Sequence, residues 1–441
     1  MPLTIPPIPP EMPTAPDRGV TVDGRPVPVH RRRGGDVALL SGVDGPVEIS
    51  VACPAGAAVR VTPARLGITA ATAGGDGRAT FRVPGPAKLR VSVTGHPPLH
   101  LLVRGPEVAP VGAGRVVTFA PGRVHDVGPV ELRDGDVAHV PAGAVVRGAF
   151  HAHGARGVAV VGHGVVDGSW CTGHYADRAG GMSMGVEFEA CQDARVDGVT
   201  VLDNSWWGIV PAASRDVVVR DVAVIGNDRH MSNDGIDVVA SERVLVEDAY
   251  VSTNDDCLAV KSTDDYADCV PWRRRVPHLG DCRDVTFRRC VLAKGRAGNA
   301  TEIGFETRCD VMEDIAFDDI DVLGSGSGAV LSIHNGDRAL VRRVRYTDVR
   351  VEQFYGLLID FRVLGSRWSR DATRGRIRDV LVRDLRTCPD PYNTPSLLGG
   401  WDADHDVRGV RFERCRVGDR PVTDADALQL FTKQARDVTF D

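Results

Sequence analysis

A six-residue pattern of apolar and polar positions recurs along the second half of the chain. The pattern, apolar–x–polar–apolar–x–apolar, begins at positions 196, 219, 246, 287, 317, 346, 382 and 412, as in VDGVTV, VEDAYV and FDDIDV. Successive copies are 23 to 41 residues apart, which is typical of solenoids, and no 3.6-residue periodicity fills the intervals. The pattern therefore predicts a parallel β-helix, in which each repeat forms one coil of short strands and stacked coils bury a continuous Val/Ile/Leu core.

The N-terminal quarter has a different pattern. Residues 20–105 alternate apolar and polar positions in short runs such as VEISVAC, ATFRVP and KLRVSVTG, separated by Gly and Pro. This spacing is typical of an antiparallel β-sandwich. The first residues are rich in Pro and predict an extended arm. We therefore expect an all-β protein with three parts: an N-terminal arm (1–19), a small β-sandwich (20–108) and a parallel β-helix (109–441).

Composition excludes several classes of function. The formal net charge is -6, so the composition does not indicate binding to nucleic acid or to an anionic membrane. No apolar run is long enough to cross a bilayer. The N-terminus lacks the features of a secretory signal, and the ten cysteines lack metal-ligand spacing. We expect free thiols, no metal, no cofactor and a cytoplasmic location, or secretion if a signal has been removed. The sequence leaves open whether the chain is a monomer or a homo-oligomer.

Two similar acidic phrases lie one short period apart. SNDGIDVVAS (232–241) nearly recurs as TNDDCLAVKS (253–262), with Asn233 matching Asn254 at an offset of 21 residues. Equivalent positions on neighbouring coils of a β-helix stack at the inter-strand distance of about 4.8 Å. The offset therefore predicts that Asp234 lies directly beside Asp255, with Asp256 adjoining.

Three stacked carboxylates differ from isolated aspartates. A single Asp in a β-helix is most often a turn residue that caps backbone amides, and acidic clusters can also bind Ca²⁺. When like charges lie a few ångströms apart, however, one pKa rises while the others stay low. The result is a protonated acid beside an ionised base, which is the pair that glycosidic bond cleavage requires.

These phrases carry a family resemblance. NDGID followed by NDDCLAVKS resembles the catalytic motifs of the polygalacturonases, glycoside hydrolase family 28, and of the related family 49 dextranases. The segment from FAPGRVHDVGPVEL to VVGHGVVDGSW resembles the start of the β-helix in the family 49-like branch, which also carries an N-terminal β-sandwich. The resemblance implies a right-handed β-helix and hydrolysis with inversion. Asp255 would protonate the leaving oxygen, and Asp234 and Asp256 would position and deprotonate the attacking water.

The chain departs from the pectinase pattern at two places. The Gly-His-Gly of family 28 pectinases corresponds here to GNATEIGFE, with Asn299 in place of the His, and their Arg-Ile-Lys corresponds to Ser332–Ile333–His334. Those cations bind the carboxylate of galacturonate in pectinases, and a uronate would lack them here. The departures predict a neutral or weakly polar carbohydrate substrate, an oligosaccharide or polysaccharide other than pectin.

Further residues are candidates for substrate binding, each with a plain structural alternative. Tryptophans before the NDGID phrase suit sugar stacking or core packing, and Lys261 suits a sugar hydroxyl or an Asp partner. Glu302 and Glu306 suit hydroxyls or salt bridges. Two histidines, one beside NDGID and one in the triplet, suit a structural or a catalytic role. The insertion 264–281, with Trp272, suits a solvated loop or a wall of the cleft. Besides Lys261, the predicted substrate-binding residues are Asn299, Glu302, His334, His230, Trp207 and Trp206.

Three alternative functions remain open at this point. A lyase or epimerase on the same fold would abstract a proton beside a uronate carboxylate, and Lys261 would suit that role. A glycosyl- or fructosyltransferase would use the same helix with a different acceptor. A non-catalytic carbohydrate-binding solenoid would not depend on Asp255.

Overall fold

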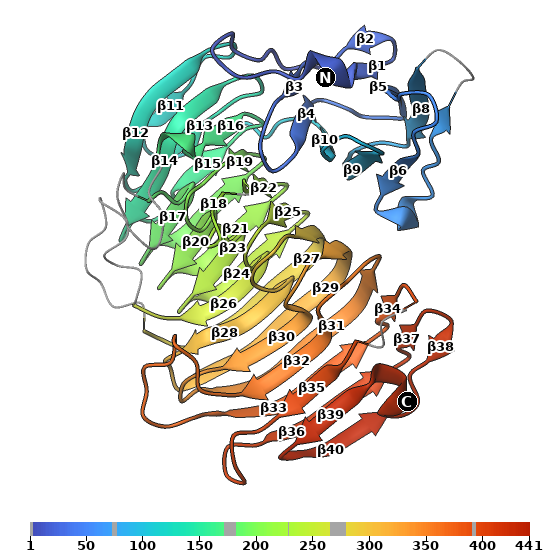
Figure 1. The fold of residues 1–441 in the computed structure, drawn as a ribbon. Helices are drawn as coiled ribbons and strands as arrows, with labels where there is room; N and C mark the ends of the chain where they lie inside the picture. The colour runs from blue at the N-terminus through green and yellow to red at the C-terminus, as the bar shows by residue number, and fades with distance from the viewer. Residues whose placement is uncertain (1–2, 73–76, 172–181, 228, 265–278, 390–393) are drawn as a thin grey trace.

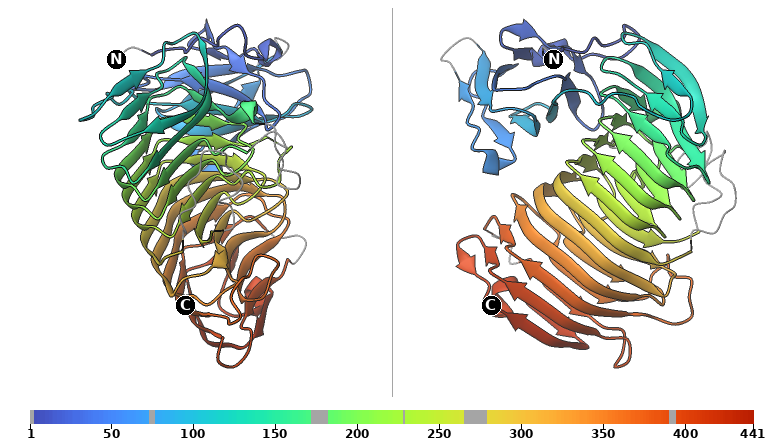
Figure 2. Two further views of the ribbon diagram at one scale, coloured as in Figure 1. Left: turned by 90° about the vertical axis from the view of Figure 1, so that its left-hand side faces the viewer. Right: turned by 180° about the vertical axis from the view of Figure 1, so that it is seen from behind.

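The computed structural model describes all residues except 1–2, 73–76, 172–181, 228, 265–278 and 390–393. A small β-sandwich lies at one end of a long stack of β-strands that continues to the C-terminus (Figure 1). The side view in Figure 2 shows the successive coils stacked one on another. The fold is a right-handed parallel β-helix preceded by a β-sandwich, as the sequence predicted.

The sandwich consists of two five-stranded sheets. Its strands are antiparallel except for β4 and β10, which run parallel. The first sheet contains β1 (Thr21–Val22), β2 (Arg25–Pro26), β5 (Val47–Ala52), β7 (Ala71–Thr72) and β8 (Arg78–Val83). The second contains β3 (Val29–His30), β4 (Asp36–Leu40), β6 (Val59–Thr62), β9 (Ala87–Val93) and β10 (Leu99–Val103). Short 3-10 helices η1 (Pro16–Arg18) and η2 (Ala64–Leu66) accompany them.

The β-helix has three faces, numbered in the order in which the chain visits them within a coil. The first face contains β11 (Val116–Thr118), β13 (Val137–His139), β15 (Ala159–Val161), β18 (Gln192–Asp197), β21 (Arg215–Arg220), β24 (Glu242–Glu247), β27 (Cys282–Lys294), β29 (Val311–Ser325), β31 (Leu340–Val351), β33 (Arg376–Arg383), β36 (Val407–Glu413) and β40 (Ala435–Phe440).

The second face contains β12 (Val124–Leu132), β14 (Val145–His153), β16 (Val165–Asp167), β19 (Thr200–Leu202), β22 (Ala223–Ile225), β25 (Tyr250–Thr253), β34 (Arg386–Thr387) and β37 (Arg416–Val417). The long strands β27, β29 and β31 bend from the first face into the second. β38 (Arg420–Pro421) pairs antiparallel with β37, and 3-10 helices η3 (Gly168–Trp170) and η4 (Asp426–Leu428) lie in turns.

The third face carries the acidic phrases. It contains β17 (Val186–Glu189), β20 (Ile209–Ala212), β23 (Ile236–Val239), β26 (Leu258–Ser262), β28 (Thr301–Thr307), β30 (Ala329–Asn335), β32 (Leu357–Val363), β35 (Ser396–Gly399) and β39 (Leu430–Lys433).

The recurring sequence pattern encodes the turn between the first and second faces. Its third position adopts the left-handed backbone conformation in all eight copies, with φ between 49° and 83°. The residue there is Asp in five copies, Arg in two and Gly in one: Gly198, Asp221, Asp248, Arg289, Asp319, Asp348, Asp384 and Arg414. Gly accepts positive φ freely and Asp tolerates it better than most residues. The apolar positions on either side of this residue point into the core.

The interior of the β-helix is one continuous apolar cluster from Phe119 to Leu428. Aromatic rings stack along it: Phe287 on Phe317 at 4.9 Å between centroids, and Phe317 on Tyr346 at 5.0 Å, both within 6° of parallel. The nine described cysteines form no disulfide. Among the described residues, no helix is long and apolar enough to cross a membrane.

The sandwich packs against the second face of the β-helix. Val37, Leu39 and Leu102 join a buried cluster with side chains of that face, including Ile225. At this interface His100 Nδ1 lies 2.6 Å from the hydroxyl of Tyr250 on β25. The contact fixes the sandwich beside the turns that lead from the second face into the third, where the acidic residues lie.

Candidate active site

The turns that enter the third face bring the acidic residues together. Asp234 precedes β23 by two residues, and Asp255 and Asp256 precede β26 on the next coil. The strands pair Ile236 with Leu258, an offset of 22 residues, and not the 21 of the sequence match. The amide of Gly235 accordingly donates to the carbonyl of Asp256, which places Asp256 in register with Asp234. The expectation that Asp255 lies in register with Asp234 was wrong, because three residues separate Asn254 from β26 and only two separate Asn233 from β23.

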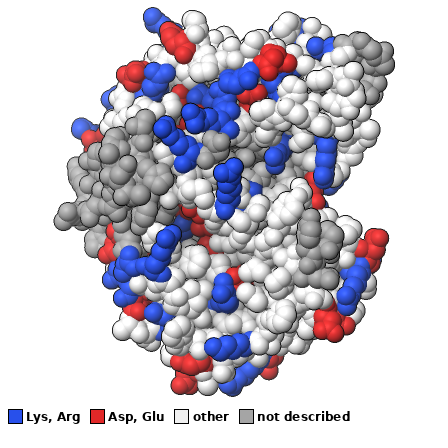
Figure 3. Space-filling view, viewed as in Figure 1, with Lys and Arg blue, Asp and Glu red and all other residues white. Residues whose placement is uncertain are grey.

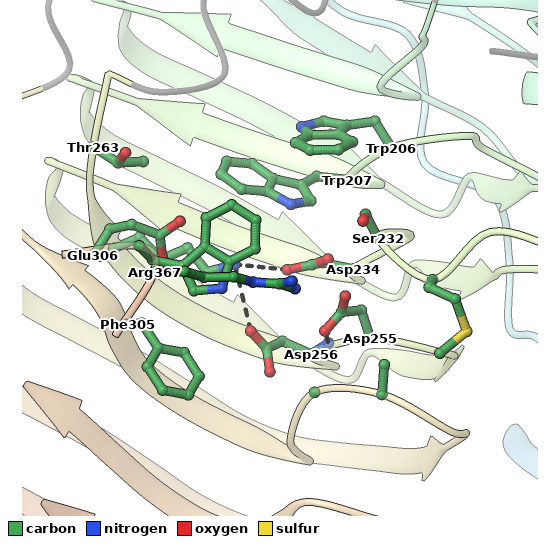
Figure 4. Close-up of a pocket in the computed structure, with 15 residues that line it drawn as sticks. Trp206, Trp207, Ser232, Asp234, Asp255, Asp256, Thr263, Phe305, Glu306 and Arg367 are labelled. Atoms are coloured by element: carbon green, nitrogen blue, oxygen red, sulfur yellow. Dashed lines mark hydrogen bonds and ion pairs between the residues drawn. The ribbon is translucent and has the colours of Figure 1, made fainter. Parts of the chain in front are cut away.

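The three carboxylates nevertheless converge. One oxygen from each of Asp234, Asp255 and Asp256 lies within 4.8 Å of the others. Lys261 Nζ lies 2.6 Å from Asp234 Oδ2 and 3.4 Å from Asp256 Oδ2 (Figure 4). It also lies 3.0 Å from Asp237 Oδ1. A cation in this position offsets part of the repulsion among the carboxylates and holds them in place.

The environment divides the carboxylates into protonated and ionised groups. Burial raises the pKa of Asp255 well above its usual range, and the charges of Asp234 and Asp256 raise it further. Burial raises the pKa of Asp234 to about 6, against the lowering effect of Lys261. Burial opposes the charge on Lys261, but the carboxylates of Asp234, Asp237 and Asp256 raise its pKa well above the usual value. Near neutral pH the site therefore holds a protonated Asp255 beside an ionised Asp234.

A pocket of about 520 Å³ opens over these groups. Two tryptophan rings stacked at 5.6 Å, those of Trp206 and Trp207, form the wall nearer the sandwich, and Lys261 Nζ lies 4.4 Å from the centre of the Trp207 ring (Figure 4). The pocket is lined by Trp206, Trp207, Met231, Ser232, Asp234, Asp255, Asp256, Lys261, Thr263, Ala297, Gly298, Phe305, Glu306, Arg367 and Trp368. An aromatic wall beside an acid and a base suits a sugar ring.

Comparison with known proteins agrees with this geometry. The sequence profile of glycosyl hydrolases family 28 matches residues 147–405, more than half of the chain. The chain belongs to glycosyl hydrolases family 28.

Individual relatives are distant. A probable polygalacturonase of Arabidopsis thaliana is 19% identical over 206 residues, which are 45% of this chain and 42% of the relative. One of Vitis vinifera is 29% identical over 77 residues, 18% of this chain and 16% of the relative. The chain thus spans less than half the length of the curated relatives it matches.

Two solved structures share the fold. Dex49A of Penicillium minioluteum has a TM-score of 0.69 at 12% identity and covers 99% of this chain and 96% of its own. The family 28 exopolygalacturonase of Yersinia enterocolitica has a TM-score of 0.50 at 12% identity, and the match covers 90% of this chain and 93% of the exopolygalacturonase. The predicted resemblance to both branches of the superfamily is confirmed.

Three predicted substrate-binding residues lie behind the pocket. Asn299 donates to Asp256 Oδ1 from its backbone amide at 2.7 Å and from Nδ2 at 3.2 Å. Glu302 is fully buried, and its Oε2 accepts from Asn299 Nδ2 at 2.6 Å and pairs with His334 Nδ1 at 2.9 Å. His334 in turn pairs with Asp360 at 2.9 Å. These side chains were expected to contact sugar. In the structure they form a chain of contacts that orients Asp256.

The same chain of contacts reaches the pocket surface by a second route. The His334 ring stacks on Phe305, with centroids 4.3 Å apart and planes within 10°, and Phe305 lines the pocket. His230 lies outside the catalytic pocket, in a neighbouring hollow. The insertion residues Trp272 and Arg273–Arg275 lie outside the described residues.

The His334 contacts predict a pH-dependent stability. Burial disfavours the charged imidazole, but Glu302 and Asp360 raise the pKa of His334 to about 10. Because the folded-state pKa lies above the unfolded value of about 6.5, this stabilisation is complete at low pH and is lost between about pH 6.5 and 10. We expect the melting temperature of the wild-type protein to fall as the pH rises across this window. The melting temperature of His334→Gln should be lower than that of the wild type at pH 7 and should change less across the window. Parallel curves for the two proteins would contradict the assignment.

Sequence reasoning missed several residues in the pocket or directly behind it. Asp237 is a charged residue inside the otherwise apolar strand IDVV, and that signal was available. Its pKa is raised well above the usual range by burial. Arg367 and Trp368 come from the loop after β32, and the Arg367 guanidinium lies 4.7 Å from the Trp368 ring centre. No periodic signal marks that loop as part of the site.

Proposed function

We propose that the enzyme cleaves a glycosidic bond with inversion and that Asp255 is the general acid. Asp255 gives its proton to the leaving oxygen as the bond to the anomeric carbon breaks. Asp234 and Asp256 take a proton from the water that attacks the opposite face of the sugar. The observation that carries the proposal is the convergence of the three carboxylates, two of which contact Lys261, with the pKa of Asp255 raised well above its usual range by burial.

We further propose that the sugar at the cleaved bond is neutral. The positions that hold cations in pectinases are Asn299 and Ser332–Ile333–His334, and their side chains are committed to the Asp256 support. The Lys261 ammonium is likewise held by carboxylates. Arg367 adds a guanidinium to the pocket that the sequence argument did not count, and a guanidinium also donates hydrogen bonds to hydroxyl groups.

A panel of substrates tests both statements. Reducing-sugar release is measured on dextran, pullulan, fructans, arabinans and polygalacturonate. We expect release from a neutral glycan and none from polygalacturonate. Activity on polygalacturonate alone would reject the neutral sugar and leave hydrolysis standing.

One observation favours a second candidate, transfer with retention. Inverting enzymes commonly hold their two carboxyl groups about 6.5–9.5 Å apart to admit a water, whereas retaining enzymes hold them about 5–5.5 Å apart. Here one oxygen from each carboxylate lies within 4.8 Å of the others, which is nearer to the second range. Proton NMR of the first-formed anomer decides: the opposite anomer supports inversion, and the same anomer supports a covalent intermediate that an acceptor sugar can intercept.

The proposed roles set the pH dependence of activity. Asp234 must be ionised to accept a proton, and its pKa is about 6, so kcat should fall as the pH drops through about 6. Asp255 must be protonated, and its pKa is raised, so kcat should fall again at higher pH. The apparent values belong to the coupled cluster. An activity that stays constant from pH 7 to pH 4.5 would contradict the assignment of Asp234 as a base.

A further inference from the structure

A second hollow lies between the sandwich and the β-helix, next to the catalytic pocket. It has a volume of about 170 Å³ and is lined by Arg31, Arg32, Arg33, Ser169, Cys171, Asp203, Asn227, Arg229 and His230. We call it the arginine hollow. The following residues of the same turn, Met231 and Ser232, line the catalytic pocket, so the two cavities share one wall. Figure 3 shows Lys and Arg side chains gathered where the sandwich meets the β-helix.

The described lining of the arginine hollow is mainly basic. Among the described lining residues, four arginines meet one carboxylate, that of Asp203. Arg32 bridges the two domains, with Nη1 at 2.9 Å from Asp203 Oδ2 and Nη2 at 3.5 Å from Asp167 Oδ2. Arg31 pairs with Asp17 and, at 3.7 Å, with Asp36.

Two further observations indicate that the described residues do not fully neutralise the arginines of the hollow. Arg33 and Arg229 are exposed and form no ion pair within the described part of the chain. The Arg32 side chain is only 6% exposed, yet its Nε–H has no hydrogen-bond acceptor among the described residues. A buried donor without an acceptor costs stability, and an oxyanion in the hollow would satisfy it.

We propose that the arginine hollow binds an oxyanion, and that this oxyanion is an acidic group on the glycan, on the sandwich side of the cleaved bond. The link to the glycan rests on the proposed function, and the anion site does not.

The position of the hollow along the β-helix supports the link. Its residues on the β-helix come from the turns after β16, β19 and β22, three successive coils, and the last of these turns also carries Asp234. One coil advances by about 4.8 Å, a length comparable to one sugar ring. Arg367 and Trp368 enter the catalytic pocket from the loop after β32, on a later coil. A glycan that leaves the pocket toward the earlier coils therefore reaches the arginines within a few sugar units.

The first test measures anion binding without catalysis. Sodium sulfate is titrated into the full chain by calorimetry at constant ionic strength. Arg33→Gln/Arg229→Gln leaves the Arg32 bridge intact, and Arg82→Gln/Arg411→Gln removes two exposed arginines elsewhere, on β8 and β36. We expect the control to bind sulfate like wild type and the first double variant to bind at least about tenfold more weakly. Equal binding by all three, or none by wild type at millimolar sulfate, would overturn the site.

The second test identifies the source of the anion. Short oligogalacturonates and their carboxyl-reduced, neutral forms are titrated into Asp255→Asn, with and without sulfate. We expect the acidic form to bind more tightly, sulfate to compete with it, and its advantage to disappear when Arg33 and Arg229 are also replaced. If sulfate binds through these arginines but does not compete, the hollow takes a free anion and the glycan assignment is wrong. Hydrolysis is judged separately by the substrate panel.

Discussion

Asp255→Asn is expected to lower kcat on the preferred glycan by roughly 10³-fold, within the range of general acid catalysis. The amide has nearly the shape of the carboxyl group, and its oxygen can still accept from the amide of Asp256, as Asp255 Oδ1 does at 3.1 Å. It cannot supply a proton to the leaving oxygen. The melting temperature should therefore change little while activity is lost. Asp310→Asn, the same change at an 85% exposed side chain, serves as the control.

The leaving group separates the acid role from other roles of Asp255. A nitrophenyl glycoside releases a phenolate that needs little protonation, so the variant should be far less impaired on it than on the natural glycan. An equal loss on both substrates would show that Asp255 acts in another way. A variant that keeps more than about a tenth of wild-type activity on the glycan would exclude it as the acid.

Lys261→Met is expected to lower the free energy of unfolding by about 3–5 kcal/mol at pH 7, because it leaves buried carboxylates without their cation. Asp234, Asp237 and Asp256 all lose the ammonium group. Without it the folded-state pKa values of Asp234 and Asp237 rise further, so the penalty applies above those values and shrinks as these two carboxylates take up protons. Urea unfolding at pH 7 and pH 5 measures the difference, and the deficit should be smaller at pH 5.

Lys294→Met is the matched control for this prediction. Lys294 is also buried, but its Nζ donates to the carbonyls of Ala297 and Gly298 at 2.9 and 3.0 Å and contacts no carboxylate in the described structure. Its loss should cost stability by a similar amount at both pH values. An equally pH-independent deficit for Lys261→Met would show that Lys261 stabilises the fold by packing and not by its charge.

Much of the fold is readable from the sequence, because the repeated pattern records local geometry. The polar third position of each copy, such as Asp248 or Asp319, marks a residue with positive φ, and the apolar neighbours mark the core. The convergence of Asp234, Asp255 and Asp256 follows from stacking alone. The register does not, because the segment from Asn254 to β26 is one residue longer than the segment from Asn233 to β23. Matching residues between the two phrases does not reveal that extra residue.

The remainder of the site depends on contacts between distant coils. Asn299, Glu302 and His334 lie on or next to the third face, as the sequence suggested. Whether each side chain points into the pocket or lies behind it depends on the contacts that it makes with neighbouring coils. Arg367 comes from a loop between β32 and β33 that follows no repeat. Arg33 belongs to the sandwich, and nothing in its own sequence indicates that it meets the turn of Arg229. Such pairings are visible only once the coils are assembled.

The left-handed turn residue between the first and second faces also constrains how such a protein can evolve. From β18 onward that turn keeps the same short length, so an insertion there would displace the coils stacked beyond it. The connections on either side of the third face differ widely in length, from 254–257 before β26 to 364–375 after β32. Changes of length are therefore tolerated mainly around the catalytic pocket. Exchanging those connections between relatives should change the substrate accepted while leaving the resistance of the scaffold to unfolding nearly the same.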